Sequence, residues 1–497
     1  MPHQDNVEII RSASKNERRH IMRHALGFYG ALTITGLYSV HDTAHAFDPA
    51  NLDHFVPALK HCIATHPILS AAIQGHTTES PNFIRPAYLD LRHHLHLHAS
   101  LLKDDLSMIT EVTKKIHDQL FLQVDQRPPW KVFIVPVADE LGSEGARRAY
   151  VIFAYSHSHG DGKSGLAFHR SFLEGLQAGC DLYDQDYICR PSASPIPPPL
   201  EEACDLTISW SYLLLNLLGP LIPSFAANYF GHTQPAISNT WTGKAMCHEP
   251  SDFHTGSQAL LVEKSLLDAA IRVCREHDVK FTGFFNQLVA HILDDALPRD
   301  VGTENLLGQI VIDLRGQTAA YSEDQMANSV SALYVSSPRS HSMSSKGATA
   351  LKHDSAFWDT ARRTTIQLAS SASTLADQPI GLLRYLSQFR PWFVNQLGKK
   401  RESSYEISNV VVFDPQSSEP STFSNTGRKD CNIERVLFSQ PANVTGSALN
   451  FQLVTRKGGD MVITLNWQLG ILDVPDEDLF TRDILRRVRE LLTEVCQ

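Results

Sequence analysis

The sequence lacks the cysteine patterns of zinc sites and of disulfide scaffolds. Zinc modules and small secreted domains depend on closely spaced cysteines. Here no two cysteines form a Cys-x-x-Cys pair, so we expect reduced thiols in a cytoplasmic protein without structural zinc. The eight cysteines are spread along the chain: Cys62, Cys180, Cys189, Cys204, Cys247, Cys274, Cys431 and Cys496.

The sequence also has no basic block, and its first residues do not predict a signal peptide. It carries 44 Lys and Arg against 54 Asp and Glu, a formal net charge of -10. A nucleic-acid backbone attracts clustered positive charge, so this composition disfavours a nucleic-acid partner and favours a small molecule. Residues 1–23 are polar and lack the apolar centre of a signal peptide.

Only one long hydrophobic run occurs, at residues 208–230. Its length suits a membrane span, but Gly219, Pro220 and Pro223 interrupt it in the middle. Three interpretations stay open: a span, a peripheral membrane contact, or a helical linker packed between two lobes. We favour the linker.

A chain of 497 residues exceeds one compact core, so we expect two lobes of mixed α/β structure. The proline-rich residues 190–200 predict an extended linker. We place a first lobe at 1–200, a crossover segment at 201–250 and a second lobe at 251–497. Periodicity predicts strands at 26–40, 130–137, 150–155, 259–263, 310–314, 330–336, 406–413, 449–454 and 461–467, with 83–98 extended. It predicts helices at 51–66, 106–121, 164–176, 265–277, 282–297, 357–371, 382–397 and 477–496, and a loop at 340–350.

A histidine and an aspartate lie four residues apart where a buried strand ends. The apolar residues 150–155 predict that strand, and Gly160 and Gly162 permit a sharp turn before the next helix. An imidazole has an ordinary pKa of about 6.5, so it can accept and return a proton near neutral pH. His157 is therefore the candidate general base. His159 is its rival, but alternation along the chain points it away from His157.

Two other kinds of site compete for this turn. Gly162, Lys163 and Ser164 look like the end of a phosphate loop, but position 157 is a histidine where that loop needs a glycine. The second alternative is a metal site built from alternating ligands. It would use His157, His159 and Asp161 with His94, His96 and His98.

The His157, Asp161 and Gly162 pattern resembles the His-x-x-x-Asp-Gly motif of the chloramphenicol acetyltransferase and condensation-domain superfamily. Flanking segments resemble it in the expected order: residues 59–69 with their His-Pro-x-Leu, 129–132 before the motif, 311–315 with Asn328 after them, and Ser-Asn at 408–409. The chain is most similar to the alcohol acetyltransferases found largely in fungi. Plant acyltransferases of the BAHD type are more distant, because their Asp-Phe-Gly-Trp-Gly motif is absent at residues 433–440.

This resemblance implies two chloramphenicol-acetyltransferase-like lobes with an active-site channel between them. In it His157 is the general base, and Asp161 turns away from the imidazole to pair with an arginine, for which Arg315 is the candidate. Gly162 would allow the donor to approach. Further polar residues that could face the channel are Ser408, Asn409, Ser439 and Gln440.

The same resemblance implies an acyl-coenzyme A donor, most simply acetyl-coenzyme A, with no permanently bound cofactor and no metal. The acceptor would be an alcohol of secondary metabolism, and the aliphatic run at 208–230 suggests an apolar one. We expect a monomer. Rival functions are acyl transfer to an amine, condensation with a carrier-bound acyl group, or a relative that no longer transfers.

Overall fold

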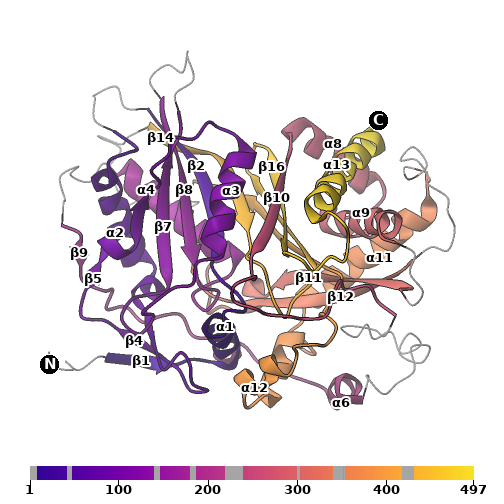
Figure 1. Cartoon of the computed structure of the whole chain (residues 1–497), viewed down its shortest axis with the longest axis horizontal. Coiled ribbons are helices and arrows are strands. Elements are labelled where there is room, and N and C mark those ends of the chain that lie inside the picture. Colours follow the sequence, from indigo (N-terminus) through magenta and orange to yellow (C-terminus); the bar gives the residue numbers. More distant parts are fainter. Residues whose placement is uncertain are drawn as a thin grey trace.

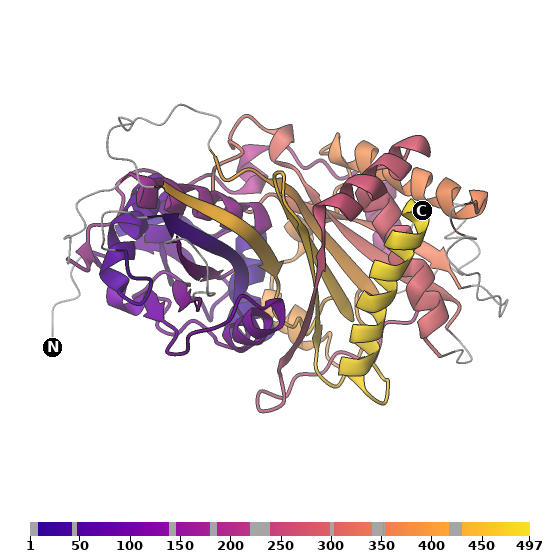
Figure 2. The same ribbon diagram turned by 90° about the horizontal axis from the view of Figure 1, so that it is seen from above.

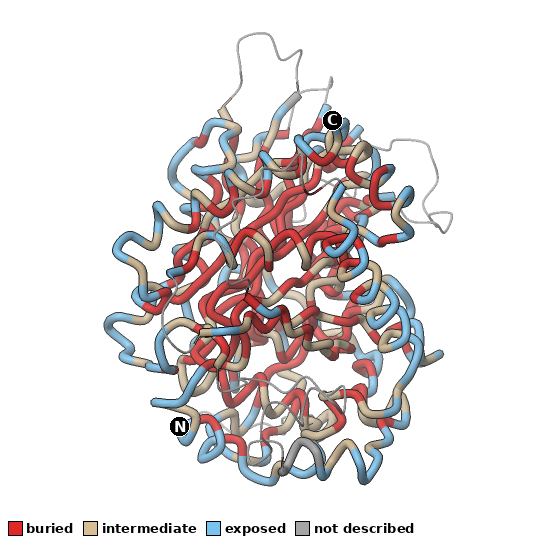
Figure 3. The backbone as a smooth tube through the Cα atoms, turned by 90° about the vertical axis from the view of Figure 1, so that its right-hand side faces the viewer, coloured by how far each residue is buried: buried red, intermediate tan, exposed pale blue. Residues whose placement is uncertain are grey.

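The chain forms two lobes that lie side by side, each built on one large β-sheet (Figures 1 and 2). The computed structural model describes residues 8–41, 47–138, 146–178, 186–218, 239–298, 303–339, 351, 353–416 and 430–497. Buried residues concentrate along the sheets in the middle of the molecule, as Figure 3 shows. The mixed α/β architecture with two lobes confirms the predicted fold class.

The first lobe has a five-stranded sheet of order β14-β2-β8-β7-β6. These strands are β14 (Asp430–Ser439), β2 (Leu32–His41), β8 (Ala146–Tyr155), β7 (Trp130–Pro136) and β6 (Leu95–Leu97). Helices α2 (Val56–Thr65) and α4 (Gly162–Gln177) cover one face, and α3 (Leu106–His117) lies on the other (Figure 1). Residues 149–155 of β8 are all buried because the strand is central and covered on both faces.

Smaller elements complete the first half of the chain. Strands β1 (Glu8–Ser12), β4 (Asn82–Arg85) and β3 (Ala72–Gln74) form a three-stranded sheet, and β5 (Leu89–Asp90) pairs with β9 (Ile188–Cys189). The predicted linker at 190–200 is extended up to α5 (Leu200–Ala203). Helix α6 (Trp210–Leu218) follows.

The second lobe has a six-stranded sheet of order β10-β16-β15-β13-β11-β12. Its strands are β10 (Thr255–Val262), β16 (Met461–Gln468), β15 (Leu449–Arg456), β13 (Tyr405–Phe413), β11 (Asn305–Asp313) and β12 (Val330–Pro338). Four long helices pack on it: α8 (Lys264–Glu276), α9 (Phe281–Ala296), α11 (Ser355–Ala372) and α13 (Glu477–Cys496). Each was expected from its apolar periodicity, and α13 has the predicted bounds.

Strand β14 crosses from the C-terminal part of the chain into the first lobe. It pairs antiparallel with β2, with Ser439 opposite Thr33, and Figure 2 shows it as a gold strand beside the indigo ones. The first sheet therefore contains a strand from beyond residue 250. The division of the chain at residues 200 and 251 stays a prediction.

The structure differs from the sequence prediction before and at the start of the predicted strand 26–40, and at 382–397. Helix α1 (Lys15–Ala25) was not predicted; it begins with a capping box between Ser14 and Glu17 and ends before Gly27, so that β2 begins only at Leu32. The predicted helix at 382–397 is instead a 3-10 turn (Pro379–Tyr385) followed by α12 (Phe389–Val394). Pro391 lacks an N–H and is tolerated only in a first helical turn, which explains the interruption.

Two sequence predictions fall wholly or partly outside the described residues. The loop at 340–350 lies there, as do residues 219–238 of the crossover segment. No helix in the described part of the chain is both long and apolar enough to cross a membrane.

Candidate active site

A cavity of about 490 Å³ lies between the lobes, and the predicted histidine turn is part of its wall. The first lobe supplies His157 and Gly162, helix α1 supplies Arg19, His20 and Arg23, and the second lobe supplies residues of β11, β12 and β13. Apolar side chains line another part of the wall: Leu32, Met246, Val311, Ile380, Leu383, Trp392 and Phe438. The cavity wall thus has charged side chains near His157 and apolar side chains elsewhere.

His157 sits in the turn between β8 and α4, half-buried and facing the cavity. The Asn328 side-chain amide donates a hydrogen bond of 2.8 Å to the His157 backbone carbonyl, and its nitrogen lies 3.2 Å from His157 Nδ1. The His20 ring stacks on the His157 ring with centroids 4.1 Å apart. Contacts from two other elements therefore fix the position and plane of the imidazole.

The surroundings of His157 keep its imidazole neutral at neutral pH. Burial lowers the pKa of His157 to about 4, and the positive charge of Arg23 lowers it further. The carboxylate of Asp161 and a hydrogen bond from the ring to its own backbone carbonyl act in the opposite direction. The neutral ring has one unprotonated nitrogen, which can accept a proton.

Asp161 turns away from the imidazole and forms a buried ion pair with Arg315. The two guanidinium nitrogens donate hydrogen bonds of 2.7 and 2.8 Å to the two carboxylate oxygens. Asp161 also caps α4 by accepting from the Ser164 N–H, and it accepts from the Ser329 N–H. This is the pairing that the sequence predicts, and it ties the turn to the second lobe.

Gly162 is the first residue of α4 and packs against side chains of β13 and β14. A Cβ atom there would come within 2.6 Å of Val410 and 3.0 Å of Phe438. Any larger residue would have to displace side chains from β13 and β14.

Of the four predicted polar residues, two line the cavity. Ser408 and Gln440 do, and Gln440 accepts a hydrogen bond from the Tyr29 hydroxyl. Ser439 and Asn409 are not among the described residues that line it. The Ser439 hydroxyl contacts His117 and Asn466, and the Asn409 amide donates to the Thr282 hydroxyl.

The other histidines of the predicted metal site make hydrogen-bond contacts with protein groups. His159 is buried, with Nε2 2.8 Å from the Ala71 carbonyl and Nδ1 3.0 Å from the Ser158 hydroxyl. His94, His96 and His98 each contact a backbone carbonyl. In the described ranges, no three His, Cys, Asp or Glu side chains gather as metal ligands would.

The charged residues of α1 were missed by the sequence reasoning. Arg19, His20 and Arg23 reach the cavity from a helix that was not predicted, together with Glu402 and Glu406 from the second lobe. The Ser14-x-x-Glu17 capping box followed by basic residues at helical spacing is the signal that could have found them.

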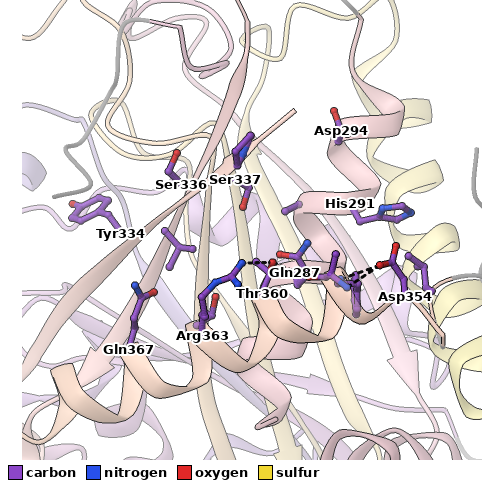
Figure 4. A pocket seen from close by; sticks show the side chains of 17 residues that line it. Gln287, His291, Asp294, Tyr334, Ser336, Ser337, Asp354, Thr360, Arg363 and Gln367 are labelled. Carbon is purple, nitrogen blue, oxygen red and sulfur yellow. Dashed lines mark hydrogen bonds between the residues drawn. The ribbon is translucent and has the colours of Figure 1, made fainter. Parts of the chain in front are cut away.

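A second cavity of about 510 Å³ lies in the second lobe between α9, α11 and β12 (Figure 4). Its polar side chains include His291 and Asp294 from α9 and Arg363 from α11, which donates to Thr360. Tyr334 lines both cavities. Because the described lining includes no residue of the histidine turn, the cavity between the lobes is the candidate active site.

Comparison with known proteins agrees with this geometry. The alcohol acetyltransferase family model matches residues 99–232, which include His157 and Asp161. A probable alcohol acetyltransferase of Fusarium pseudograminearum is 23% identical over 95% of this chain and 93% of its own length. Another, of Aspergillus fumigatus, is 25% identical over 93% of this chain and 96% of its own.

The chain is similar to alcohol acetyltransferases of fungi. It is an acyltransferase, and the similarity to these relatives implies an acyl-coenzyme A donor and an alcohol acceptor.

Solved structures of other proteins have the same overall fold as this chain. A trichothecene 15-O-acetyltransferase from Fusarium sporotrichioides has a TM-score of 0.70 at 12% identity, with 98% of this chain and 95% of the other covered. The epimerization domain of a tyrocidine synthetase has a TM-score of 0.56 at 12% identity, covering 98% and 97%. The two-lobed fold is thus shared with enzymes whose sequences have diverged widely.

Proposed function

We propose that this protein transfers an acetyl group from acetyl-coenzyme A to a hydroxyl group of a small molecule in secondary metabolism, with His157 as general base. The observation that carries this proposal is the position of the His157 imidazole at the wall of a cavity between two lobes. The alcohol acetyltransferase relatives support the reaction class.

In the proposed reaction, the unprotonated ring nitrogen of His157 removes the proton of the acceptor hydroxyl as the hydroxyl oxygen attacks the thioester carbonyl carbon. The tetrahedral intermediate then loses the coenzyme A thiolate, which takes the proton from the imidazolium. The products are an ester and free coenzyme A, and no acyl-enzyme forms. Such a base contributes about 10²–10⁴-fold, and holding both substrates in one cavity can offset about 7–11 kcal/mol of the barrier.

The other site residues have positioning or binding roles in this proposal. Asp161 and Arg315 hold the turn that carries His157. Gly162 leaves room for the donor, and Ser408 and Gln440 offer polar groups to the substrates at the cavity wall. Because their side chains bond elsewhere, Ser439 and Asn409 serve by holding the strands of the wall.

We further propose a cytoplasmic monomer without a permanently bound cofactor. Seven cysteines lie in the described part of the chain and all are free thiols, as expected in a reducing compartment. A peripheral membrane contact at residues 208–230 stays a prediction. Size-exclusion chromatography with light scattering, with and without vesicles, tests both the monomer and the membrane contact.

The test of the reaction is mass spectrometry of products from acetyl-coenzyme A and a library of alcohols, polyols and amines. We expect acetyl esters, and a loss of about 10²–10⁴-fold in kcat for His157→Ala without a matching loss of thermal stability. His93→Ala, at an exposed histidine, is the control. Products only from amines, or a donor preference for an acyl-carrier protein over acetyl-coenzyme A in direct competition, would replace the proposal with one of its rivals.

A further inference from the structure

Helix α1 presents two arginines to the cavity beside the proposed base. Arg19 and Arg23 lie one helical turn apart and both line the cavity, with His20 between them stacked on His157. The Arg23 residue is 8% exposed. Two guanidinium groups thus lie beside the proposed base, and Arg23 is largely shielded from solvent.

No carboxylate forms an ion pair with either arginine among the described residues. The Arg23 guanidinium lies over the Tyr29 ring, 4.2 Å from its centroid, and its Nε is buried without a hydrogen-bond partner. The Arg19 guanidinium has one hydrogen-bond contact among the described residues, to the ring nitrogen of His20 at 3.2 Å, and its Nε is also buried and unpartnered there. In this the two differ from Arg315, whose charge is neutralised by Asp161.

Two carboxylates that line the same cavity accept hydrogen bonds from neutral groups instead. Glu402 accepts from the Tyr334 hydroxyl, and Glu406 accepts from the Gln440 amide at 3.0 Å. Glu406 is buried enough that its pKa is raised above the usual range. The arginines therefore keep donors that the described protein groups do not use.

The stacking of Arg23 on Tyr29 prepares it to bind an anion. A guanidinium binds an aromatic ring through its face and a carboxylate through its edge, so the contact with Tyr29 fixes the plane and leaves the edge free. A buried charge without a partner is unfavourable, and a bound anion would relieve that cost. Burial lowers the pKa of Arg23 to about 10, so the group is still charged at neutral pH.

We propose that the acceptor alcohol of this enzyme carries a carboxylate, which Arg23 and Arg19 bind while the apolar wall holds the rest of the molecule. This inference rests on the proposed function and names its substrate class. It narrows the apolar acceptor expected from the sequence to an amphiphilic hydroxycarboxylic acid. Phosphate groups of coenzyme A are the other anions that the arginines could bind, and the test separates the two.

The first measurement compares hydroxycarboxylic acids of increasing chain length, aliphatic and aromatic, with their methyl esters as acceptors for acetyl-coenzyme A. We expect the best acid to have a kcat/KM about tenfold to hundredfold above that of its ester, the range of one or two charged hydrogen bonds. Arg23→Met should remove most of this preference, and Arg23→Lys should keep part of it because the charge remains. Arg18→Met is the matched control, since Arg18 lies on the same helix but donates to the Ala13 carbonyl outside the cavity.

The second measurement is calorimetric binding of the same acids and esters without acetyl-coenzyme A. Tighter binding of the acid, lost in Arg23→Met and kept in Arg18→Met, supports the inference. Equal binding of every acid and its ester would overturn it, as would an Arg23→Met variant that weakens only acetyl-coenzyme A binding. Absence of turnover with all acceptors would contradict the proposed function, whereas the binding preference tests this inference separately.

Discussion

The buried pair of Asp161 and Arg315 allows a quantitative prediction about stability. Asp161→Asn keeps the size of the side chain and an oxygen for the helix cap, but it leaves the Arg315 charge without its main partner. Breaking a buried ion pair from one side costs about 3–5 kcal/mol. Asp313 lies 3.3 Å from the same guanidinium and partly compensates, so we expect about 3 kcal/mol, the lower end of that range.

This free energy can be converted into a change of melting temperature. A unit of about 200 residues, such as one lobe, gains about 0.4 kcal/mol/K of entropy on unfolding. A loss of about 3 kcal/mol then lowers Tm by about 7 °C, which scanning calorimetry measures directly. The control is Asp268→Asn, which removes an exposed pair with Lys264 on α8 and should cost less than about 1 kcal/mol.

A double variant separates the pair from other effects of the substitution. Arg315→Met alone leaves Asp161 buried with only neutral donors, whereas Asp161→Asn combined with Arg315→Met removes both charges. The double variant should be more stable than the sum of the two single losses predicts. Additive losses, or an Asp161→Asn protein as stable as Asp268→Asn, would refute the reasoning.

Three further predictions concern activity. His157 must be neutral to act as a base, and its pKa is lowered to about 4. For a neutral acceptor, kcat/KM should therefore be constant at neutral pH and fall as the pH drops through about 4 to 5. In Arg23→Met the positive charge that lowers the pKa of His157 is removed, so this fall should move to higher pH. Asn328→Ala should lower kcat by about tenfold or more with little change in Tm, since the amide holds the His157 carbonyl. Gly162→Ala should raise the KM for acetyl-coenzyme A or destabilise the fold, because the added Cβ meets Val410 and Phe438. Wild-type kinetics and Tm in this variant would contradict the close packing of Gly162 against these two side chains.

The centre of the first lobe could be predicted from sequence because local signals agree there. The apolar run of β8, the glycines of the turn and the periodicity of α4 all point to the same strand, turn and helix. Helix α1 gives weak signals by comparison, since its basic residues leave few apolar positions for a periodic pattern. Its place at the cavity comes from packing against α12, where Met22 and Phe28 meet Phe389 and Phe393.

The polar residues of the cavity wall show a second limit of sequence reasoning. Ser408 and Asn409 are neighbours on β13, so their side chains point to opposite faces and only one can reach the cavity. The same alternation separates Ser439 from Gln440 at the end of β14. Which member faces inward depends on the register of β14 with β2, a pairing between residues about 400 positions apart in the chain that no local pattern encodes.

The position of the proposed base depends on the contact between the lobes. Asp161 and Ser164 belong to the first lobe, while Arg315, the Ala327 carbonyl and Asn328, which hold the turn, lie between β11 and β12 of the second. Separating the lobes here would break the ion pair between Asp161 and Arg315 together with the hydrogen bonds that Ser164 and Asn328 make across the contact. We therefore expect the lobes to stay together at this contact during turnover, so that substrates enter the cavity through its openings while the imidazole keeps its place.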